Sequence, residues 1–186
     1  MGAVRAKEHA DGIDFEKDVE SKFHILYGED LAKPLPPKPW LVKGLGIAPG
    51  PPTILGGAGF GGKTMAAQAM ALSVATGQKL WGHFDVRQGE ALHLDWEQDE
   101  LTVRRYQRMA RSAKIDLASL RRLLGASLTP NASLDDEGTE RSLTYLCKSK
   151  ALCIVDSFRG AFRRAQENDS TVYDHLAMLK RVSVKT

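Results

Sequence analysis

The residues from Thr53 to Thr64 constrain the fold more than any other part of the sequence. They read Thr-Ile-Leu-Gly-Gly-Ala-Gly-Phe-Gly-Gly-Lys-Thr, a short apolar run followed by a glycine-rich stretch. Glycine adopts φ > 0 freely and lets the backbone approach an anion closely. Four residues separate Gly57 from Gly62-Lys63-Thr64, the spacing at which backbone N–H groups cradle phosphates, the lysine reaches the β- and γ-phosphates and the hydroxyl joins Mg²⁺. The stretch therefore predicts a short buried strand that turns through a phosphate-binding loop into a helix.

The sequence on the far side of this loop supports that interpretation. Residues Met65 to Thr76 form an Ala-rich run of helix-forming residues, and Gly77 stands where a helix ends. Such a helix would add its positive N-terminal end to the phosphate site. The alternative, a flexible glycine-rich turn that happens to carry a lysine, remains open. The residues predicted to hold the phosphates are Gly57, Ala58, Gly59, Phe60, Gly61, Gly62, Lys63 and Thr64.

Composition narrows the class of protein. The chain has 186 residues, 42% of them hydrophobic, and a net charge of +3. This content allows one domain with a full-sized core, whereas so small a net charge does not by itself indicate a nucleic-acid partner. Two cysteines, Cys147 and Cys153, do not make a disulfide framework. No run of 18 apolar residues occurs, so we expect a cytoplasmic protein that does not bind a membrane.

Three regions of the chain differ in composition. Residues 1–30 are expected to be a polar N-terminal arm, because charged residues are frequent there and show no clear period. Residues 31–50 are rich in proline and are expected to form an extended strap. The remaining residues, 51–186, are predicted to form an α/β domain with a mainly parallel sheet between helices.

Two acidic residues follow a predicted strand in the middle of the chain. Leu92 and Leu94 alternate with polar residues and lead to Asp95 and Glu97. In open α/β sheets ligands bind at the carboxyl ends of strands, so acids there are placed to meet the phosphates. A carboxylate in that position can orient and deprotonate an attacking water. An acid that only opens the next helix is an almost equal alternative for Asp95 and a weaker one for Glu97.

A second strand also ends in an acid. The apolar run Ala151 to Val155 is typical of a strand buried on both faces, and Asp156 follows it. An aspartate at a strand tip, some 90 residues after a phosphate-binding loop, predicts a ligand for the Mg²⁺ that Thr64 would also hold. Ser157 could touch the same metal or cap the next turn.

Arginines cluster at two places. The predicted helix from Asp99 to about Lys114 carries several of them, and Arg105 is the one that we expect to reach the nucleotide, although a solvated helix face is the usual role for such charges. Arg159, Arg163 and Arg164 follow the second acidic strand. They indicate either contact with a nucleic-acid backbone or an ordinary surface loop.

Taken together, these segments resemble the RecA-like ATPases, and among them the hexameric replicative helicases of the plasmid RepA type and related AAA domain proteins. The resemblance extends from about Leu31 to the end of the chain. It rests on Gly57–Thr64, Ala75–Gly82, Leu92–Glu97, and Ile154–Arg159 followed by Glu167-Asn168. It implies a RecA-like P-loop NTPase fold, ATP and Mg²⁺ as cofactors, and Glu97 as the catalytic base. It also implies DNA as a partner and a ring of identical subunits.

One departure from that family affects the expected activity. The family's sheet continues with a further apolar strand and an arginine donated between subunits, and neither is visible after Asp156. We therefore expect a domain that is incomplete on its C-terminal side, and the activity of this chain alone is an open question. Two other functions are compatible with the same residues: a nucleotide-dependent regulatory or DNA-binding module with little turnover, and a small-molecule kinase.

Overall fold

The computed structural model describes residues 19–20, 22–164 and 171–186. They belong to two compact units, residues 1–37 and 38–186. Most of the predicted polar arm, and the segment 166–170 that contains Glu167 and Asn168, lie outside the described residues. The first unit contains the short helix α2 (Gly28–Leu31). The division at residues 30 and 50 stays a prediction, whereas the α/β architecture is visible in the second unit.

Helices and parallel strands alternate along the second unit. Its long helices are α3 (Lys63–Thr76), α4 (Asp99–Ser112), α5 (Thr139–Cys147) and α7 (Thr171–Lys185), and its strands are β1 (Ala91–Asp95), β2 (Leu124–Leu128) and β3 (Leu152–Asp156). Shorter elements are α6 (Phe158–Ala161) and the 3-10 turns η1 (Lys43–Leu45) and η2 (Leu117–Leu120).

The sheet has the strand order β2-β1-β3, and both pairings are parallel. Its central strand β1 has four of its five residues buried, and two of these, His93 and Asp95, are polar. The register places Asp95 opposite Leu128 on one side and opposite Asp156 on the other. Both predicted acidic strand ends therefore lie at the same edge of the sheet.

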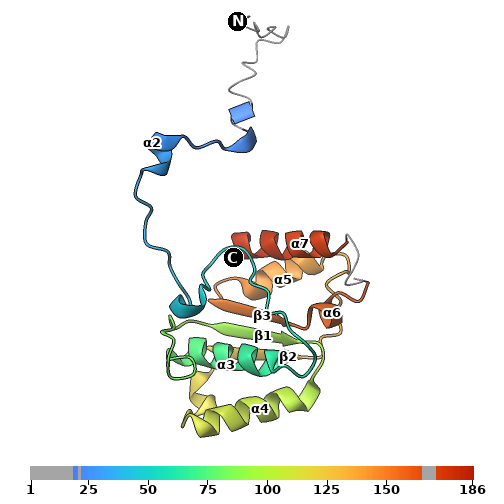
Figure 1. Cartoon of the computed structure of the whole chain (residues 1–186). Helices are drawn as coiled ribbons and strands as arrows, with labels where there is room; N and C mark the ends of the chain where they lie inside the picture. The colour runs from blue at the N-terminus through green and yellow to red at the C-terminus, as the bar shows by residue number, and fades with distance from the viewer. Residues whose placement is uncertain (1–18, 21, 165–170) are drawn as a thin grey trace, which may run out of the picture. The chain divides into compact units, whose positions relative to one another are not determined.

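Helices cover both faces of this sheet (Figure 1). On one face, α3 packs against all three strands and against α4. On the other, α5 packs against α7, and α6 lies beside β3. The predicted RecA-like P-loop α/β fold, with a parallel sheet between helices, is confirmed.

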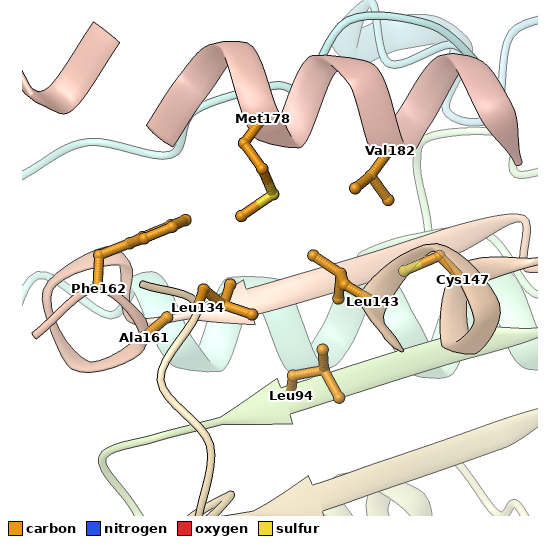
Figure 2. Packing of buried hydrophobic residues seen from close by; sticks show 8 residues of the cluster. All are labelled: Leu94, Leu134, Leu143, Cys147, Ala161, Phe162, Met178 and Val182. Carbon is orange, nitrogen blue, oxygen red and sulfur yellow. The ribbon is translucent and has the colours of Figure 1, made fainter. Parts of the chain in front are cut away.

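An apolar cluster fills the space between the sheet and helices α5 and α7. Figure 2 shows Met178 and Val182 on α7 directed toward Leu143 of α5 and Leu94 of β1. Phe162, at the end of α6, is fully buried in the same cluster. Closely packed aliphatic and aromatic side chains of this kind contribute most of the hydrophobic stabilisation of a domain.

The strand predicted before the phosphate-binding loop does not form. Residues 52–58 have no regular secondary structure, and Ile54 and Leu55 are 69% and 53% exposed. Pro51 and Pro52 have no backbone N–H to donate to a sheet, and the glycines from residue 56 onward have no side chain to bury. Only three residues of strand-forming type remain, whereas each strand that forms has five.

Part of the proline-rich strap, residues 38–50, belongs to the second unit and contributes to its core. Leu41 and Val42 are buried in the cluster that also contains residues of α3 and β1. Val42 forms antiparallel bridges with Ile47 and Val86, so this short segment is held by backbone hydrogen bonds as well as by apolar contact.

Candidate functional site

The phosphate-binding loop turns tightly before α3 begins. Gly61 N–H donates to the Ala58 carbonyl over 3.2 Å, and a Cβ added at Gly61 would lie only 3.0 Å from that oxygen. Gly62 precedes α3 with φ of +78°, the left-handed region that glycine adopts without strain. The Phe60 side chain at the tip of the loop is fully exposed. The predicted turn through glycines into a helix is therefore present.

Lys63 is the first residue of α3 and folds back over the loop. Its ammonium donates to the carbonyl oxygens of Gly57 and Ala58, each at 2.8 Å. These bonds hold the positive charge across the loop, next to the N-terminal end of a long helix. A phosphate bound in the loop would replace those carbonyls as the acceptor, and its oxygens would accept the hydrogen bonds that the Lys63 ammonium donates.

Thr64, the second residue of α3, meets the end of β3. The pKa of Asp156 is lowered, most strongly by the His93 ring and to a smaller extent by the nearby Thr64 hydroxyl, while burial opposes both effects. His93 Nε2 lies 3.5 Å from Asp156 Oδ2, a separation longer than that of a good hydrogen bond.

The Thr64 and Asp156 pair has the chemistry that Mg²⁺ requires. Asp156 Oδ2 is buried and has no hydrogen-bond partner in the described part of the chain. Mg²⁺ prefers oxygen ligands, and it is usually held by one or two carboxylates together with waters and substrate phosphates. No cluster of three or more His, Cys, Asp or Glu side chains among residues 19–20, 22–164 and 171–186 could hold a metal by itself. The geometry fits a metal shared with a bound phosphate.

Glu97 lies beside the end of β3, although it follows β1. The Ser157 hydroxyl donates to Glu97 Oε1, and Ser157 Oγ also accepts from Gly160 N–H at 3.2 Å, capping α6. A Cβ at Gly160 would lie 2.8 Å from Trp96 Cβ and 3.7 Å from Glu97 Cγ. The glycine thus lets α6 approach the segment after β1, which brings Glu97 next to the strand that carries Asp156.

Asp95 has the other role that the sequence allowed. It is fully buried, and its Oδ1 accepts from the N–H groups of Glu97 and Gln98 at 2.8 and 2.9 Å. Its Oδ2 accepts from the Thr102 hydroxyl. Because both carboxylate oxygens are already engaged, Asp95 holds the turn that leads into α4 and is not free to activate water.

Arg105 differs from the other arginines of α4. Arg104, Arg108 and Arg111 are exposed, whereas Arg105 is half-buried, and its Nη1 is buried with no hydrogen-bond partner in the part of the chain that the structure describes. Its charge contributes to the low pKa of Asp156. The structure therefore directs Arg105 toward the site and not toward solvent.

Sequence reasoning missed a buried polar chain under the site. His93 is fully buried, and its Nδ1 lies 3.1 Å from the Tyr106 hydroxyl on α4. Burial, together with the negative charges of Asp95 and Asp156, raises the pKa of Tyr106. The signal was present: in Leu92-His93-Leu94 the period of two places His93 on the face of Asp95, where a buried histidine needs a polar partner.

An open cleft of about 890 Å³ adjoins the edge of the sheet at which Asp95 and Asp156 lie. It lies where the segments after β1, β2 and β3 meet, and its lining includes Trp96, Asn131, Arg159, Gly160, Arg163 and Arg164. The three arginine side chains are exposed. The Trp96 indole N–H donates to the Ala132 carbonyl at 2.9 Å, which fixes the ring at the cleft wall.

Comparison with protein-family models gives a match over residues 20–186 to the AAA domain family. The chain belongs to the AAA domain family. As a member it is a nucleotide-binding domain of the P-loop ATPase class, so the predicted ATPase class is confirmed at this level. The RepA-type subtype, the DNA partner and the individual site residues stay predictions. No curated protein sequence matches the chain.

None of the helices described by the structure combines the length and the apolar character needed to cross a membrane.

Proposed function

We propose that this AAA domain hydrolyses ATP at the edge of the sheet where β1 and β3 end. Residues from three separate elements meet there, and this convergence is the observation that carries the proposal. The Thr64 hydroxyl lies close enough to Asp156 to lower the pKa of its carboxyl group, and the Ser157 hydroxyl donates to Glu97. Lys63 stands on the same helix as Thr64, with its ammonium across the loop.

Each residue has a distinct role in the proposal. The loop amides of residues 57–62 and the Lys63 ammonium bind the β- and γ-phosphates, and Thr64 and Asp156 hold Mg²⁺. A bound Mg²⁺ would neutralise charge that develops on the transferred phosphoryl group. Glu97 is exposed and can accept a proton from an attacking water. Arg105, which stands on α4, supplies a further positive charge to the nucleotide site.

Replacing Glu97 by Gln tests this assignment, because glutamine keeps the size of the side chain and loses the ability to accept a proton. We expect release of inorganic phosphate at saturating Mg·ATP to fall by on the order of 10²–10⁴-fold. Affinity for ATP, followed with a fluorescent nucleotide analogue, should stay within a few-fold of the original. The matched control is Glu100→Gln, since Glu100 is an exposed carboxylate that pairs with Arg104 on α4. Equal rates for Glu97→Gln and Glu100→Gln would contradict the role of Glu97.

A second part of the proposal concerns DNA. We propose that the domain belongs to a RepA-type helicase ring and that single-stranded DNA enters the cleft beside Glu97. The supporting observation is the set of three exposed arginines around Trp96, none of which forms an ion pair with another described residue. Arginine binds phosphate oxygens, and an aromatic ring can stack on a base.

The DNA proposal is tested by measuring ATP hydrolysis with and without single-stranded DNA at several salt concentrations. We expect stimulation that weakens as salt rises and that disappears in the double variant Arg163→Ala, Arg164→Ala, while the rate without DNA stays unchanged. Tight ATP binding without turnover or DNA stimulation would favour the regulatory module. A phosphorylated small molecule formed in place of free phosphate would favour the kinase.

A further inference from the structure

The two cysteines of the chain lie in contact on the face of the sheet covered by α5 and α7. Cys147 is the last residue of α5, and Cys153 is the second residue of β3. Their Sγ atoms are 2.9 Å apart, and both thiols are free. Cys147 is 6% exposed and packs in the cluster drawn in Figure 2, and Cys153 packs against that cluster from β3.

The backbone around the pair is held at both ends. Lys150 N–H donates to the Cys147 carbonyl at 2.9 Å, and Ala151 N–H donates to the Glu90 carbonyl at 2.8 Å. The Lys150 ammonium also pairs with the Glu90 carboxylate. The short connection from α5 to β3 is therefore fixed to the strand beside it, and it keeps the two sulfur atoms together.

The two thiols differ chemically. The Cys153 thiol and the positive charge of Lys150 lower the pKa of Cys147, against the effect of burial. The Cys147 neighbour and burial raise the pKa of Cys153. A thiolate is the nucleophile in disulfide exchange, and the direction of these shifts favours Cys147 as the attacking sulfur. Cys147 ends α5 between two exposed residues, Leu146 and Lys148.

We propose that Cys147 and Cys153 form a redox-modification site that closes to a reversible intrachain disulfide on reaction with a low-molecular-weight disulfide. The Cys147 thiolate attacks one sulfur of the reagent, and its S–S bond breaks to release one thiolate. Cys153 then loses its proton and attacks Cys147 Sγ, which forms the intrachain bond and releases the second thiolate. The two cysteine sulfurs are oxidised, and the reagent is reduced to two thiols.

The position of the pair gives the modification a structural consequence. Cys153 lies three residues before Asp156 on β3, so the new bond ties the end of α5 to the strand that ends at the nucleotide site. Disulfides in reducing compartments are usually transient and redox-sensing. The site is separate from the residues proposed for ATP hydrolysis, and its test does not depend on that activity.

The experiment incubates the whole protein with defined ratios of oxidised to reduced glutathione, quenches with acid, blocks free thiols with N-ethylmaleimide and digests with trypsin. Trypsin cleaves after Lys148 and Lys150, between the cysteines, and after Arg141 and Arg159. The disulfide therefore joins peptides 142–148 and 151–159, and the joined pair is lighter than the two separate thiol peptides by two hydrogen atoms. In Cys153→Ser we expect a glutathione adduct on Cys147 and no joined pair.

A parallel incubation in concentrated urea separates the effect of the fold from mere closeness in sequence. If the native backbone holds the sulfurs together, the ratio of disulfide to dithiol at a given glutathione ratio should be at least about tenfold higher in the native protein. Equal or lower ratios in the native protein would overturn the proposal. So would recovery of both cysteines as N-ethylmaleimide adducts at every glutathione ratio.

Discussion

Asp95 and Asp156 end neighbouring parallel strands and stand opposite each other in the register of the sheet. Their surroundings differ in one decisive respect. Both oxygens of Asp95 accept hydrogen bonds, from two backbone N–H groups and the Thr102 hydroxyl. Asp156 Oδ2 is buried without a hydrogen-bond partner among the residues that the structure describes. A buried acceptor left unpaired is costly, which supports the proposal that Asp156 is the carboxylate that holds the metal.

The helix that follows each strand explains this difference. After β1, helix α4 begins within a few residues, and the N–H groups that precede it bind Asp95. After β3, the first turn of α6 is capped by Ser157, whose Oγ accepts from Gly160 N–H. Because Ser157 performs the capping, the carboxylate of Asp156 is left for another use. The position of an acid at a strand end is therefore not sufficient to define its role.

The largest expected effect comes from the same substitution at the two positions. We expect Asp156→Asn to lower ATP hydrolysis by roughly 100-fold or more, since it removes a charged ligand from a metal that stabilises the transition state. Asp95→Asn should leave the rate within a few-fold, because the asparagine oxygen still accepts the backbone N–H groups and the Thr102 hydroxyl can reverse its role. Steady-state phosphate release at saturating Mg·ATP measures both.

Mg²⁺ titration of the two variants provides the control. Asp156→Asn should need a higher Mg²⁺ concentration for half-maximal binding of a fluorescent ATP analogue, and Asp95→Asn should not. Equal losses of activity in the two variants would remove the distinction between a metal ligand and a residue that only holds the turn before α4.

Alanine substitutions should affect stability in the opposite order, with a larger loss at Asp95 than at Asp156. Asp95→Ala leaves two backbone N–H groups and a buried hydroxyl without their partner, which we expect to lower the free energy of unfolding by about 3 kcal/mol. Urea unfolding followed by circular dichroism measures this. Asp156→Ala, the matched variant, should cost clearly less because Asp156 accepts fewer hydrogen bonds. A smaller loss of stability for Asp95→Ala than for Asp156→Ala would contradict the comparison.

Some of this arrangement was predictable from the sequence, because it depends on local signals. The glycine spacing of residues 57–62 and the Ala-rich run before Gly77 predicted the loop and α3, and the apolar run before Asp156 predicted β3. These features arise from backbone freedom and from burial along one segment. The strand before the loop was wrongly predicted because a strand also needs a partner and enough pairing residues, which Pro51, Pro52 and the glycines do not provide.

The distinction between the two aspartates was not predictable, since it depends on contacts between segments. Asp95 was left open between base and cap, and its contacts decide the question: the N–H groups of Glu97 and Gln98 occupy Oδ1, and the Thr102 hydroxyl occupies Oδ2. His93 was overlooked because a single histidine within a strand is not part of a recognised motif. It is nevertheless the largest influence on the pKa of Asp156. Such effects can be recognised only when the distances between side chains of different segments are known.

The smallest expected effect is the pH dependence of stability at Asp156. The pKa of Asp156 is lowered in the folded protein, so its carboxylate stabilises the fold above the unfolded-state pKa of about 3.9. That contribution is lost as pH falls through the lower folded-state pKa. We therefore expect the stability difference between the original protein and Asp156→Asn, measured by urea unfolding, to be present at pH 5 and to shrink toward pH 3. In a His93→Gln background the difference at pH 5 should be smaller, because the His93 ring is the main cause of the low pKa. A difference that is independent of pH, or that grows as pH falls, would show that the folded state does not favour the charged form of Asp156.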